Sequence, residues 1–418
     1  MDIWHVRGGR RLEGTAYVQG SKNASLPILA ASILCPARTE LTNVPKLKDV
    51  DAALLILRKL GCTAVQEGNR VFIDSSSLIS SAIPFELMKE MRSSVIFLGA
   101  LVARCGAAKL SLPGGCRLGK RPIDLHLDSL RQMGAYIEEN RGEIFCAADT
   151  LKGTEISLSF PSVGATENIM LAACGADGKT VINGAAREPE IKALQDYLNA
   201  LGAEIYGAGT SRIVIENFSG RKQVGYKIIP DRIAASTLCC CTAAAGGRVE
   251  LKNIIPEHFF AVSSFLKRSG CDIITKNDSL VISSDGALRS PGKIFTYPYP
   301  GFPTDAQPVL MAALLKADGE TAITENIFEN RFRQVGELKK LGAKITVNDK
   351  TAYITGTDKL VGNTLSATDL RGGASMIVAG LSADGETVIS DEGHIRRGYD
   401  SFDSCLRSIG ADISLVHE

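Results

Sequence analysis

The stretch Leu201-Gly202-Ala203-Glu204-Ile205 decides the fold, because a helical run that ends in glycine before a short apolar strand recurs six times in this chain. The six repeated glycines are Gly61, Gly134, Gly202, Gly270, Gly342 and Gly410. They are separated by 73, 68, 68, 72 and 68 residues. A period of this length that fills the whole chain predicts one supersecondary unit of about 70 residues copied six times.

Each copy has the same order of predicted elements. A first helix is followed by a glycine turn and a short apolar strand, as in residues 176–182, 317–323 and 383–389. We expect this glycine to cap the helix with a positive φ. A second helix, whose first turn is set by Pro189 in the third copy, ends at the repeated glycine, and two strands finish the unit. The pattern predicts an α/β fold of six βαβαββ-type repeats with crossovers long enough for parallel strand pairing.

The length of the chain predicts two domains, since 418 residues exceed the size at which a single core keeps growing. The first and fourth copies open similarly, at residues 20–27 and 229–236, which marks two sets of three repeats. We therefore place one domain at residues 22–229 and a second at residues 230–418. Residues 1–21 precede the first helix and are expected to complete the second domain.

Composition and charge indicate a cytoplasmic protein. A net charge of +1 provides no basic field for nucleic acid. The most apolar run, residues 97–103, is interrupted by Arg104, so we expect neither a signal peptide nor a membrane span. Eleven cysteines without C-x-x-C spacing favour a reduced compartment. Successive residues of a helix point about 100° apart, so Cys239, Cys240 and Cys241 are interpreted as buried core thiols rather than metal ligands.

The starts of the helices carry a second pattern. The first helices of the six copies open with chemically diverse residues, whereas capping alone would give Ser, Thr, Asp or Asn throughout. Several helix N-termini aimed at one cleft would form an anion site. In the second helices, Lys48, Arg121 and Arg397 stand 13 residues before the repeated glycine, where a cation opposes the helix dipole. The candidate ligands for phosphate and carboxylate groups are therefore Lys22, Arg92, Arg121, Arg331, Arg371 and Arg397.

The second copy differs from the others in a glycine-rich loop, Leu112-Pro113-Gly114-Gly115-Cys116-Arg117-Leu118-Gly119-Lys120-Arg121. Such a loop is typical of a mobile lid near a substrate. Cys116 lies among three cationic side chains, which favour the thiolate and raise its reactivity.

Taken together, these features resemble the UDP-N-acetylglucosamine enolpyruvyl transferases from Val6 to the C-terminus. The matching phrases are Gly20-Ser21-Lys22-Asn23-Ala24, Leu112-Pro113-Gly114-Gly115-Cys116, Arg121-Pro122-Ile123-Asp124-Leu125-His126, Pro161-Ser162-Val163-Gly164-Ala165-Thr166, Ala186-Arg187-Glu188-Pro189-Glu190, Pro303-Thr304-Asp305, Phe328-Glu329-Asn330-Arg331-Phe332, Thr368-Asp369-Leu370-Arg371 and Arg397-Gly398-Tyr399. The resemblance implies a two-domain inside-out α/β barrel with three repeats in each domain around a cleft. It also implies the first committed step of peptidoglycan precursor synthesis, and with it a role in cell-wall biogenesis, cell shape and cell division.

The resemblance further implies a reaction and its residues. The family moves the enolpyruvyl group of phosphoenolpyruvate to the sugar 3-hydroxyl and releases phosphate, without a metal or an organic cofactor. Cys116 corresponds to the proton donor, which is also implicated in a covalent adduct with phosphoenolpyruvate and is alkylated by fosfomycin. Asp305 corresponds to the base, and Lys22 stabilises charge at the phosphate. The residues implied for phosphoenolpyruvate are Lys22, Asn23, Arg121, Arg331, Arg371 and Arg397. Those implied for UDP-N-acetylglucosamine are Asn23, Arg92, Arg121, Pro122, Ile123, Asp124, Leu125, Ser162, Val163, Gly164, Asp305 and Ile327.

Several residues also allow simpler interpretations. We favour His126 as a hydrogen-bonding residue near a helix start over a general base. Asp231 is interpreted either as an N-cap or as a residue of the cleft. Asp305 is favoured as a base because Thr304 before it is itself a good cap.

Two other functions compete with the implied one. The first is the enolpyruvyl transferase of the shikimate pathway, in which serine stands at the position of Asn23 and the loop at residues 113–116 is lacking. The second is a regulatory paralogue that binds the nucleotide sugar without catalysis. The presence of Lys22, Cys116 and Asp305 together speaks against this second alternative.

Overall fold

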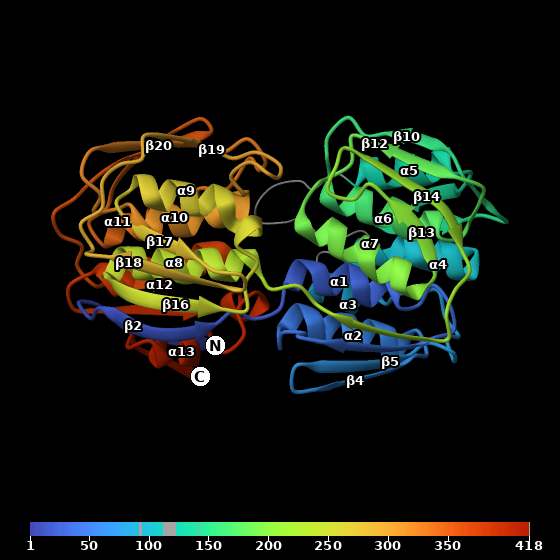
Figure 1. Cartoon of the computed structure of the whole chain (residues 1–418), viewed down its shortest axis with the longest axis horizontal. Helices are drawn as coiled ribbons and strands as arrows, with labels where there is room; N and C mark the ends of the chain where they lie inside the picture. The colour runs from blue at the N-terminus through green and yellow to red at the C-terminus, as the bar shows by residue number, and fades with distance from the viewer. Residues whose placement is uncertain (92–93, 112–122, 141, 418) are drawn as a thin grey trace. The chain divides into compact units, whose positions relative to one another are not determined.

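The computed structural model describes residues 1–91, 94–111, 123–140 and 142–417 of the chain. They form two compact units, each with its own hydrophobic core (Figure 1). The N-terminal unit holds the described residues from 20 to 229, and the C-terminal unit holds residues 1–19 together with residues 230–417. The chain thus passes between the units at 19/20 and 229/230, where the sequence analysis placed divisions at 21/22 and 229/230.

Helices and short strands alternate through the N-terminal unit. Its helices are α1 (Lys22–Ala31), α2 (Lys48–Lys59), α3 (Phe85–Glu90), η1 (Ser94–Ile96), α4 (Phe97–Cys105), α5 (Asp124–Gln132), α6 (Val163–Ala173) and α7 (Pro189–Leu201). Its strands are β3 (Arg38–Thr42), β4 (Thr63–Glu67), β5 (Arg70–Asp74), β6 (Ala107–Ser111), β7 (Tyr136–Asn140), β8 (Glu143–Ala147), β9 (Leu151–Lys152), β10 (Glu155–Ser157), β11 (Ala176–Asp177), β12 (Thr180–Asn183), β13 (Ala203–Tyr206), β14 (Arg212–Phe218) and β15 (Gln223–Lys227).

The C-terminal unit has a similar alternation. Its helices are α8 (Arg232–Ala245), η2 (Pro256–Phe259), α9 (Phe260–Arg268), η3 (Thr304–Ala306), α10 (Gln307–Ala313), α11 (Val335–Lys340), α12 (Leu370–Ser382), η4 (Ile395–Arg397) and α13 (Phe402–Ser408). Its strands are β1 (Asp2–Arg7), β2 (Leu12–Tyr17), β16 (Gly247–Lys252), β17 (Asp272–Thr275), β18 (Ser279–Ser284), β19 (Lys293–Phe295), β20 (Glu320–Thr324), β21 (Lys344–Asn348), β22 (Thr351–Thr355), β23 (Thr364–Ser366), β24 (Glu386–Asp391) and β25 (Asp412–His417).

The described strands form several small sheets rather than one large one. The N-terminal unit contains the orders β15-β3-β5-β4, β6-β8-β7 and β10-β12-β14-β13, with a short β11-β9 pair. The C-terminal unit contains β17-β18-β16-β2, β19-β20-β22-β21 and β23-β24-β1-β25. Each unit is therefore an α/β structure whose helices pack against several separate sheets.

Strand direction corrects the expectation of parallel pairing. The two strands after a second helix form an antiparallel hairpin, as β4 with β5 and β21 with β22. The strand after a first helix pairs antiparallel with that hairpin and parallel with one further strand, as β3 does with β5 and β15. A helical crossover gives parallel neighbours, whereas a tight turn gives antiparallel ones. Among the described strands, each four-stranded sheet has one parallel pair, and the short β9–β11 pair is also parallel.

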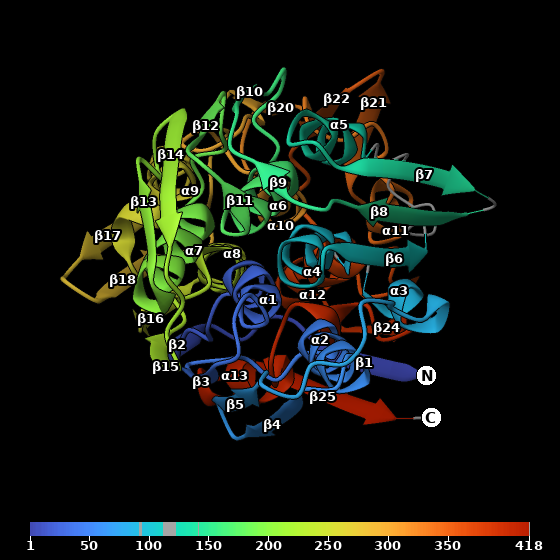
Figure 2. The same cartoon turned by 90° about the vertical axis from the view of Figure 1, so that its right-hand side faces the viewer.

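The pairing also explains where the first residues of the chain belong. β10 and β12 flank α6 and pair parallel with each other. At the starts of the two units the partners are exchanged, because β2 precedes α1 but pairs with β16, whereas β15 precedes α8 but pairs with β3. β1 pairs with both β24 and β25, so the first and last strands of the chain lie side by side (Figure 2). Residues 1–19 therefore complete two sheets of the C-terminal unit.

Helices form the inner layer of the C-terminal unit, where α8, α10 and α12 pack against one another. A helix buried on all sides needs apolar or small residues around its circumference, and α8 is buried over nearly its whole length. Cys239, Cys240 and Cys241 lie on α8 and are fully buried, which confirms the prediction of core thiols. Within the described ranges, no helix has both the length and the apolar character that a membrane crossing requires.

The repeated glycines have the backbone conformation that the sequence predicts. φ is between 91° and 109° at all six of them, in the region that disfavours residues with a side chain. The second set of glycines corrects the sequence interpretation. Gly178 also has a positive φ, of 90°, but α6 ends earlier and is capped at Cys174. Gly178 instead makes the turn between β11 and β12.

Candidate active site

In the N-terminal unit, the first predicted site residue along the chain is Lys22. It is the first residue of α1, and the preceding Ser21 caps the helix by accepting a hydrogen bond from Ala24 N at 3.2 Å. The Lys22 ammonium lies 2.6 Å from the Asp49 carboxylate, with side chains 12% and 2% exposed. Asp49 belongs to the first turn of α2. A buried carboxylate thus holds the lysine in place, while part of the lysine side chain stays accessible.

Two further helix starts in this unit carry predicted nucleotide-sugar residues. Asp124 is the first residue of α5 and is exposed, and Leu125 beside it is half-buried. Ser162 caps α6 and accepts a hydrogen bond from Ala165 N at 3.3 Å. Because α5 and α6 pack together, residues 123–125 and residues 162–164 lie at the starts of neighbouring helices.

His126 connects these two helices. The Asn168 amide of α6 accepts from Gly99 N at 2.8 Å and donates to Val95 O at 3.0 Å, which assigns its oxygen and its nitrogen. Its Nδ2 must then donate to His126 Nδ1, 2.7 Å away, and the imidazole proton is on Nε2. Burial lowers the pKa of His126 to about 4. His126 is therefore a neutral hydrogen-bonding residue, which confirms the favoured interpretation over a general base.

The imidazole of His126 also explains a glycine of the site. A Cβ added to Gly164 would lie 2.9 Å from His126 Cε1 and 3.2 Å from Nε2. The ring therefore covers the first turn of α6, and a side chain at residue 164 would displace it.

Asp305 is the centre of an ion-pair cluster in the C-terminal unit. Its Oδ1 accepts from Arg331 Nη2 at 2.9 Å, and its Oδ2 accepts from Arg371 Nη2 at 3.2 Å. Both arginine side chains are only 3% exposed, whereas the Asp305 side chain is 30% exposed. The carboxylate is thus held by two buried guanidinium groups, while part of the Asp305 side chain stays exposed. Asp305, Arg331 and Arg371, three residues predicted for the site, are therefore in contact although they are far apart in the sequence.

Arg371 has features of a residue that binds anions. It lies in the first turn of α12, with its guanidinium carbon 5.3 Å from the centre of the Tyr399 ring. Burial by itself lowers the pKa of Arg371, but Tyr399, Asp305 and Asp231 have the opposite effect, and the net pKa is above its ordinary value. A side-chain hydrogen bond with Tyr399 also contributes to this raised pKa. A permanently charged guanidinium of this kind can pair with a negatively charged ligand.

Two further residues named in the sequence analysis, Asp231 and Arg397, belong to the C-terminal unit as well. The Asp231 carboxylate caps α8 by accepting from Ile233 N at 2.8 Å and from Ala234 N at 3.0 Å. This confirms the interpretation of Asp231 as an N-cap, and Asp231 also contributes to the raised pKa of Arg371. Its place in the cleft stays a prediction. Arg397 ends η4, which packs against α12, and its side chain is half-buried.

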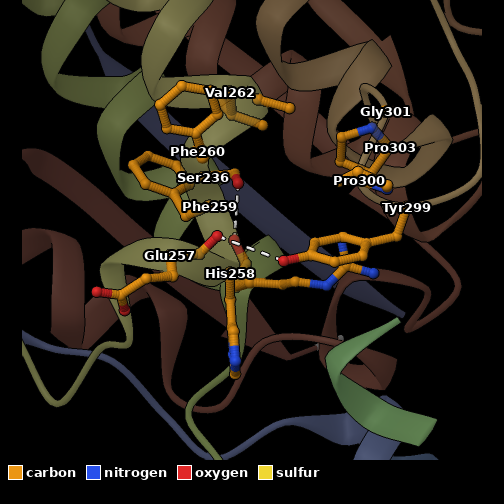
Figure 3. A pocket seen from close by; sticks show the side chains of 12 residues that line it. Ser236, Glu257, His258, Phe259, Phe260, Val262, Tyr299, Pro300, Gly301 and Pro303 are labelled. Atoms are coloured by element: carbon orange, nitrogen blue, oxygen red, sulfur yellow. Dashed lines mark hydrogen bonds between the residues drawn. The ribbon is translucent and has the colours of Figure 1, made fainter. Parts of the chain in front are cut away.

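A small pocket lies beside the start of α8. It is lined by residues of η2, α9 and the 299–303 turn, and the Arg232 guanidinium carbon lies 5.5 Å from the centre of the Tyr299 ring (Figure 3). Tyr299 Oη donates to Glu257 O at 3.5 Å, so two of the lining residues are joined by a hydrogen bond. The pocket volume of about 30 Å³ has room for a few water molecules at most.

Asn23 follows Lys22 in α1, and Ile327 lies in the turn after β20. Other residues that the sequence analysis singled out lie outside the described parts of the chain. They are Arg92, Cys116, Arg117, Lys120, Arg121 and Pro122. In the parts that the structure describes, no three His, Cys, Asp or Glu side chains are grouped closely enough to hold a metal.

The structure adds three residues that the sequence analysis missed. Asp49 pairs with Lys22, Asn168 orients His126, and Glu325 accepts hydrogen bonds from the segment that carries Asp305. Asp49 directly follows Lys48, which the helix-start pattern had singled out. Nothing comparable in the sequence marks Asn168 or Glu325, because the partners of Asn168 and the two threonines that donate to Glu325 are distant in the chain.

Comparison with known proteins identifies the class. The family model of EPSP synthase (3-phosphoshikimate 1-carboxyvinyltransferase) matches residues 6–406, and the chain belongs to this family. A solved enolpyruvyl transferase, NikO from Streptomyces tendae, superposes with a TM-score of 0.88 at 26% identity and covers 99% of each chain.

The particular relatives confirm the resemblance seen in the sequence. The chain is 47% identical over 413 residues to UDP-N-acetylglucosamine 1-carboxyvinyltransferase 2 of Caldanaerobacter subterraneus subsp. tengcongensis, with 99% of both proteins covered. It is 43% identical over 420 residues to the protein of the same name from Carboxydothermus hydrogenoformans, with 100% of both covered.

Proposed function

We propose that the protein transfers the enolpyruvyl group of phosphoenolpyruvate to the 3-hydroxyl of UDP-N-acetylglucosamine and releases phosphate. The observation that carries this proposal is the full-length identity of 43–47% to proteins named for that activity. Such a reaction is the first committed step of peptidoglycan precursor synthesis, so it serves cell-wall biogenesis, cell shape and division. Free thiols at every described cysteine support a cytoplasmic location.

The charged side chains fit the donor substrate. Phosphoenolpyruvate carries a phosphate and a carboxylate, and cationic side chains bind both groups through charge-assisted hydrogen bonds. Lys22 of the N-terminal unit and Arg331 and Arg371 of the C-terminal unit have their cationic groups largely buried. The remaining members of the proposed set are Asn23, Arg121 and Arg397.

The nucleotide sugar is assigned to a second set of residues. Asp124, Leu125, Ser162 and Gly164 are at helix starts, where free backbone N–H groups suit a diphosphate. The full proposed set is Asn23, Arg92, Arg121, Pro122, Ile123, Asp124, Leu125, Ser162, Val163, Gly164, Asp305 and Ile327.

The proposed mechanism is an addition followed by an elimination. The sugar 3-hydroxyl oxygen attacks C2 of phosphoenolpyruvate while Asp305 takes the hydroxyl proton and Cys116 gives a proton to the methylene carbon. Lys22 stabilises the phosphate of the adduct. The Cys116 thiolate then takes a proton from the new methyl group while phosphate leaves from C2, which restores the double bond as an enol ether.

The arrangement of the units supports a finer proposal about the fold. We infer that residues 22–229 form one domain and residues 230–418, completed by residues 1–21, form the other, each an inside-out barrel of three repeats. In support, each unit has three main sheets, and helices form the interior of the C-terminal unit.

A phosphate-release assay with UDP-N-acetylglucosamine and phosphoenolpyruvate tests the function. We expect release that requires both substrates. Absence of release at saturating concentrations would favour the regulatory alternative. Release with shikimate 3-phosphate instead of the nucleotide sugar would favour the shikimate-pathway alternative. The identity to solved EPSP synthases from Acinetobacter baumannii is only 19% and 21%.

A further inference from the structure

Glu325 is a buried carboxylate at the end of β20, and only 3% of the residue is exposed. Its Oε1 accepts hydrogen bonds from Thr296 Oγ1 at 2.9 Å, Ile327 N at 2.8 Å and Phe328 N at 3.1 Å. Its Oε2 accepts from Thr304 Oγ1 at 3.0 Å. All four donors are neutral. Burial of a carboxylate is unfavourable unless it is well bonded, so the carboxylate holds these donors firmly.

These hydrogen bonds join separate segments of the chain. Thr296 follows β19, Thr304 opens η3, and Ile327 and Phe328 belong to the turn after β20. Thr304 was expected to cap the helix before Asp305, but the N-cap is Pro303 and no side chain caps this turn. The Thr304 hydroxyl is turned towards Glu325 instead.

The chain of contacts continues to Asp305. Thr304 O accepts from Arg331 Nε at 3.3 Å and from Nη2 at 3.1 Å. The same Nη2 donates to Asp305 Oδ1 at 2.9 Å. The Arg331 guanidinium carbon also lies 5.8 Å from the centre of the Phe328 ring, on the turn that Glu325 closes. Glu325 therefore holds Arg331 from two sides, through Thr304 and through Phe328.

We propose that Glu325 is a positioning residue for the reaction, which orients the Asp305 carboxylate through Thr304 and Arg331. This inference rests on the proposed function. A purely structural role would make Glu325 only a stabiliser of the turn. The two roles differ in their consequences, because only positioning makes the orientation and the proton affinity of Asp305 depend on the Thr304 hydroxyl.

Thr304→Val is the sharpest test because it removes one hydroxyl and keeps the size of the side chain. Without the bond to Glu325 the Thr304 segment can shift, and with it the Thr304 backbone oxygen that accepts from Arg331 Nε and Nη2. We expect kcat for phosphate release to fall roughly ten-fold, a change typical of a lost orienting contact. The KM for UDP-N-acetylglucosamine should stay within about two-fold, because Glu325 still bonds Ile327 and Phe328. Thr304→Ser, which keeps the hydroxyl, should restore kcat.

The pH profile separates positioning from stability. A weaker Arg331 contact stabilises the Asp305 carboxylate less, so the acid limb of kcat should move to higher pH in Thr304→Val. The matched control is Thr351→Val, which removes a hydroxyl that shares a hydrogen bond of 2.9 Å with Thr324 on the neighbouring strand. This control should leave kcat and the acid limb unchanged.

Glu325→Gln provides a second variant in case Thr304→Val does not fold. The amide oxygen can keep the three Oε1 bonds, but an NH2 group would face Thr304 Oγ1, which would have to accept instead of donate. We expect a several-fold fall in kcat with the same shift of the acid limb. If both variants fold and match the wild type in kcat and in pH profile, the inference is overturned. If the wild type itself releases no phosphate, the proposed function fails first, and this inference with it.

Discussion

Acid should destabilise the N-terminal unit through a single buried imidazole. The pKa of His126 falls from 6.5 to about 4 on folding because the ring is buried, and protonation of Nδ1 would also break its hydrogen bond with Asn168. Because the folded-state pKa is depressed, the unfolded chain binds a proton first, and stability is lost as the pH falls from about 6.5 towards 4. Between pH 7 and pH 5 the expected loss is about 2 kcal/mol.

A variant is needed to isolate this effect. Burial and the neighbouring Glu190 and Glu188 raise the pKa of Glu167, which acts with the opposite sign and adds stability as the pH falls. We therefore compare the wild type with His126→Gln at both pH values, so that the contribution of Glu167 cancels. His417→Gln, on the exposed strand end of β25, is the matched control and should retain the full acid loss.

Urea denaturation followed by circular dichroism measures the two units together. Trp4 is the one tryptophan of the chain and lies in the core of the C-terminal unit, so its fluorescence reports the unfolding of that unit. A transition that appears in circular dichroism but not in fluorescence is therefore assigned to the N-terminal unit. The wild type should lose about 2 kcal/mol more than His126→Gln on going from pH 7 to pH 5. Equal losses in the two proteins, or an imidazole titration by NMR with a midpoint near 6.5, would refute the reasoning.

Three further predictions concern the proposed reaction. Asp305→Asn should lower kcat by about 10²-fold or more while UDP-N-acetylglucosamine binding is largely kept, because an amide cannot take the hydroxyl proton; near wild-type turnover in the phosphate-release assay would remove Asp305 from the base role. Asp49→Asn removes the carboxylate 2.6 Å from the Lys22 ammonium, so the KM for phosphoenolpyruvate should rise about ten-fold, with the exposed Asp51→Asn as a control that stays near wild type; equal effects in both variants would argue against a specific role for the pair. Cys116→Asp should stay active and resist fosfomycin, since a carboxylic acid can still protonate carbon but is a poor nucleophile, whereas Cys116→Ser should be largely inactive; intact-protein mass spectrometry that maps the adduct to another cysteine would contradict this role.

Backbone features that depend only on neighbouring residues could be predicted from the sequence. A glycine that ends a helix with a positive φ is a property of a few neighbouring residues, so the six repeated glycines predicted six helix ends that the structure contains. The same locality applies to the site. Lys22 and Arg371 were predicted at helix starts because a helix start depends on adjacent residues, and the structure places them there.

Contacts between distant residues were decided only by the tertiary structure. Asp49 is 27 positions from Lys22, and Arg371 is 66 positions from Asp305, so no spacing rule links either pair. The pairing partner of each strand also depended on packing, because the spacing of apolar residues in a sequence does not say which strand lies next to which. The pairing of β2 with β16 and of β15 with β3 could therefore be seen only in the folded units. Glu325 was missed for a similar reason, because two of its four donors, Thr296 and Thr304, are 29 and 21 positions away and only folding brings them to the carboxylate.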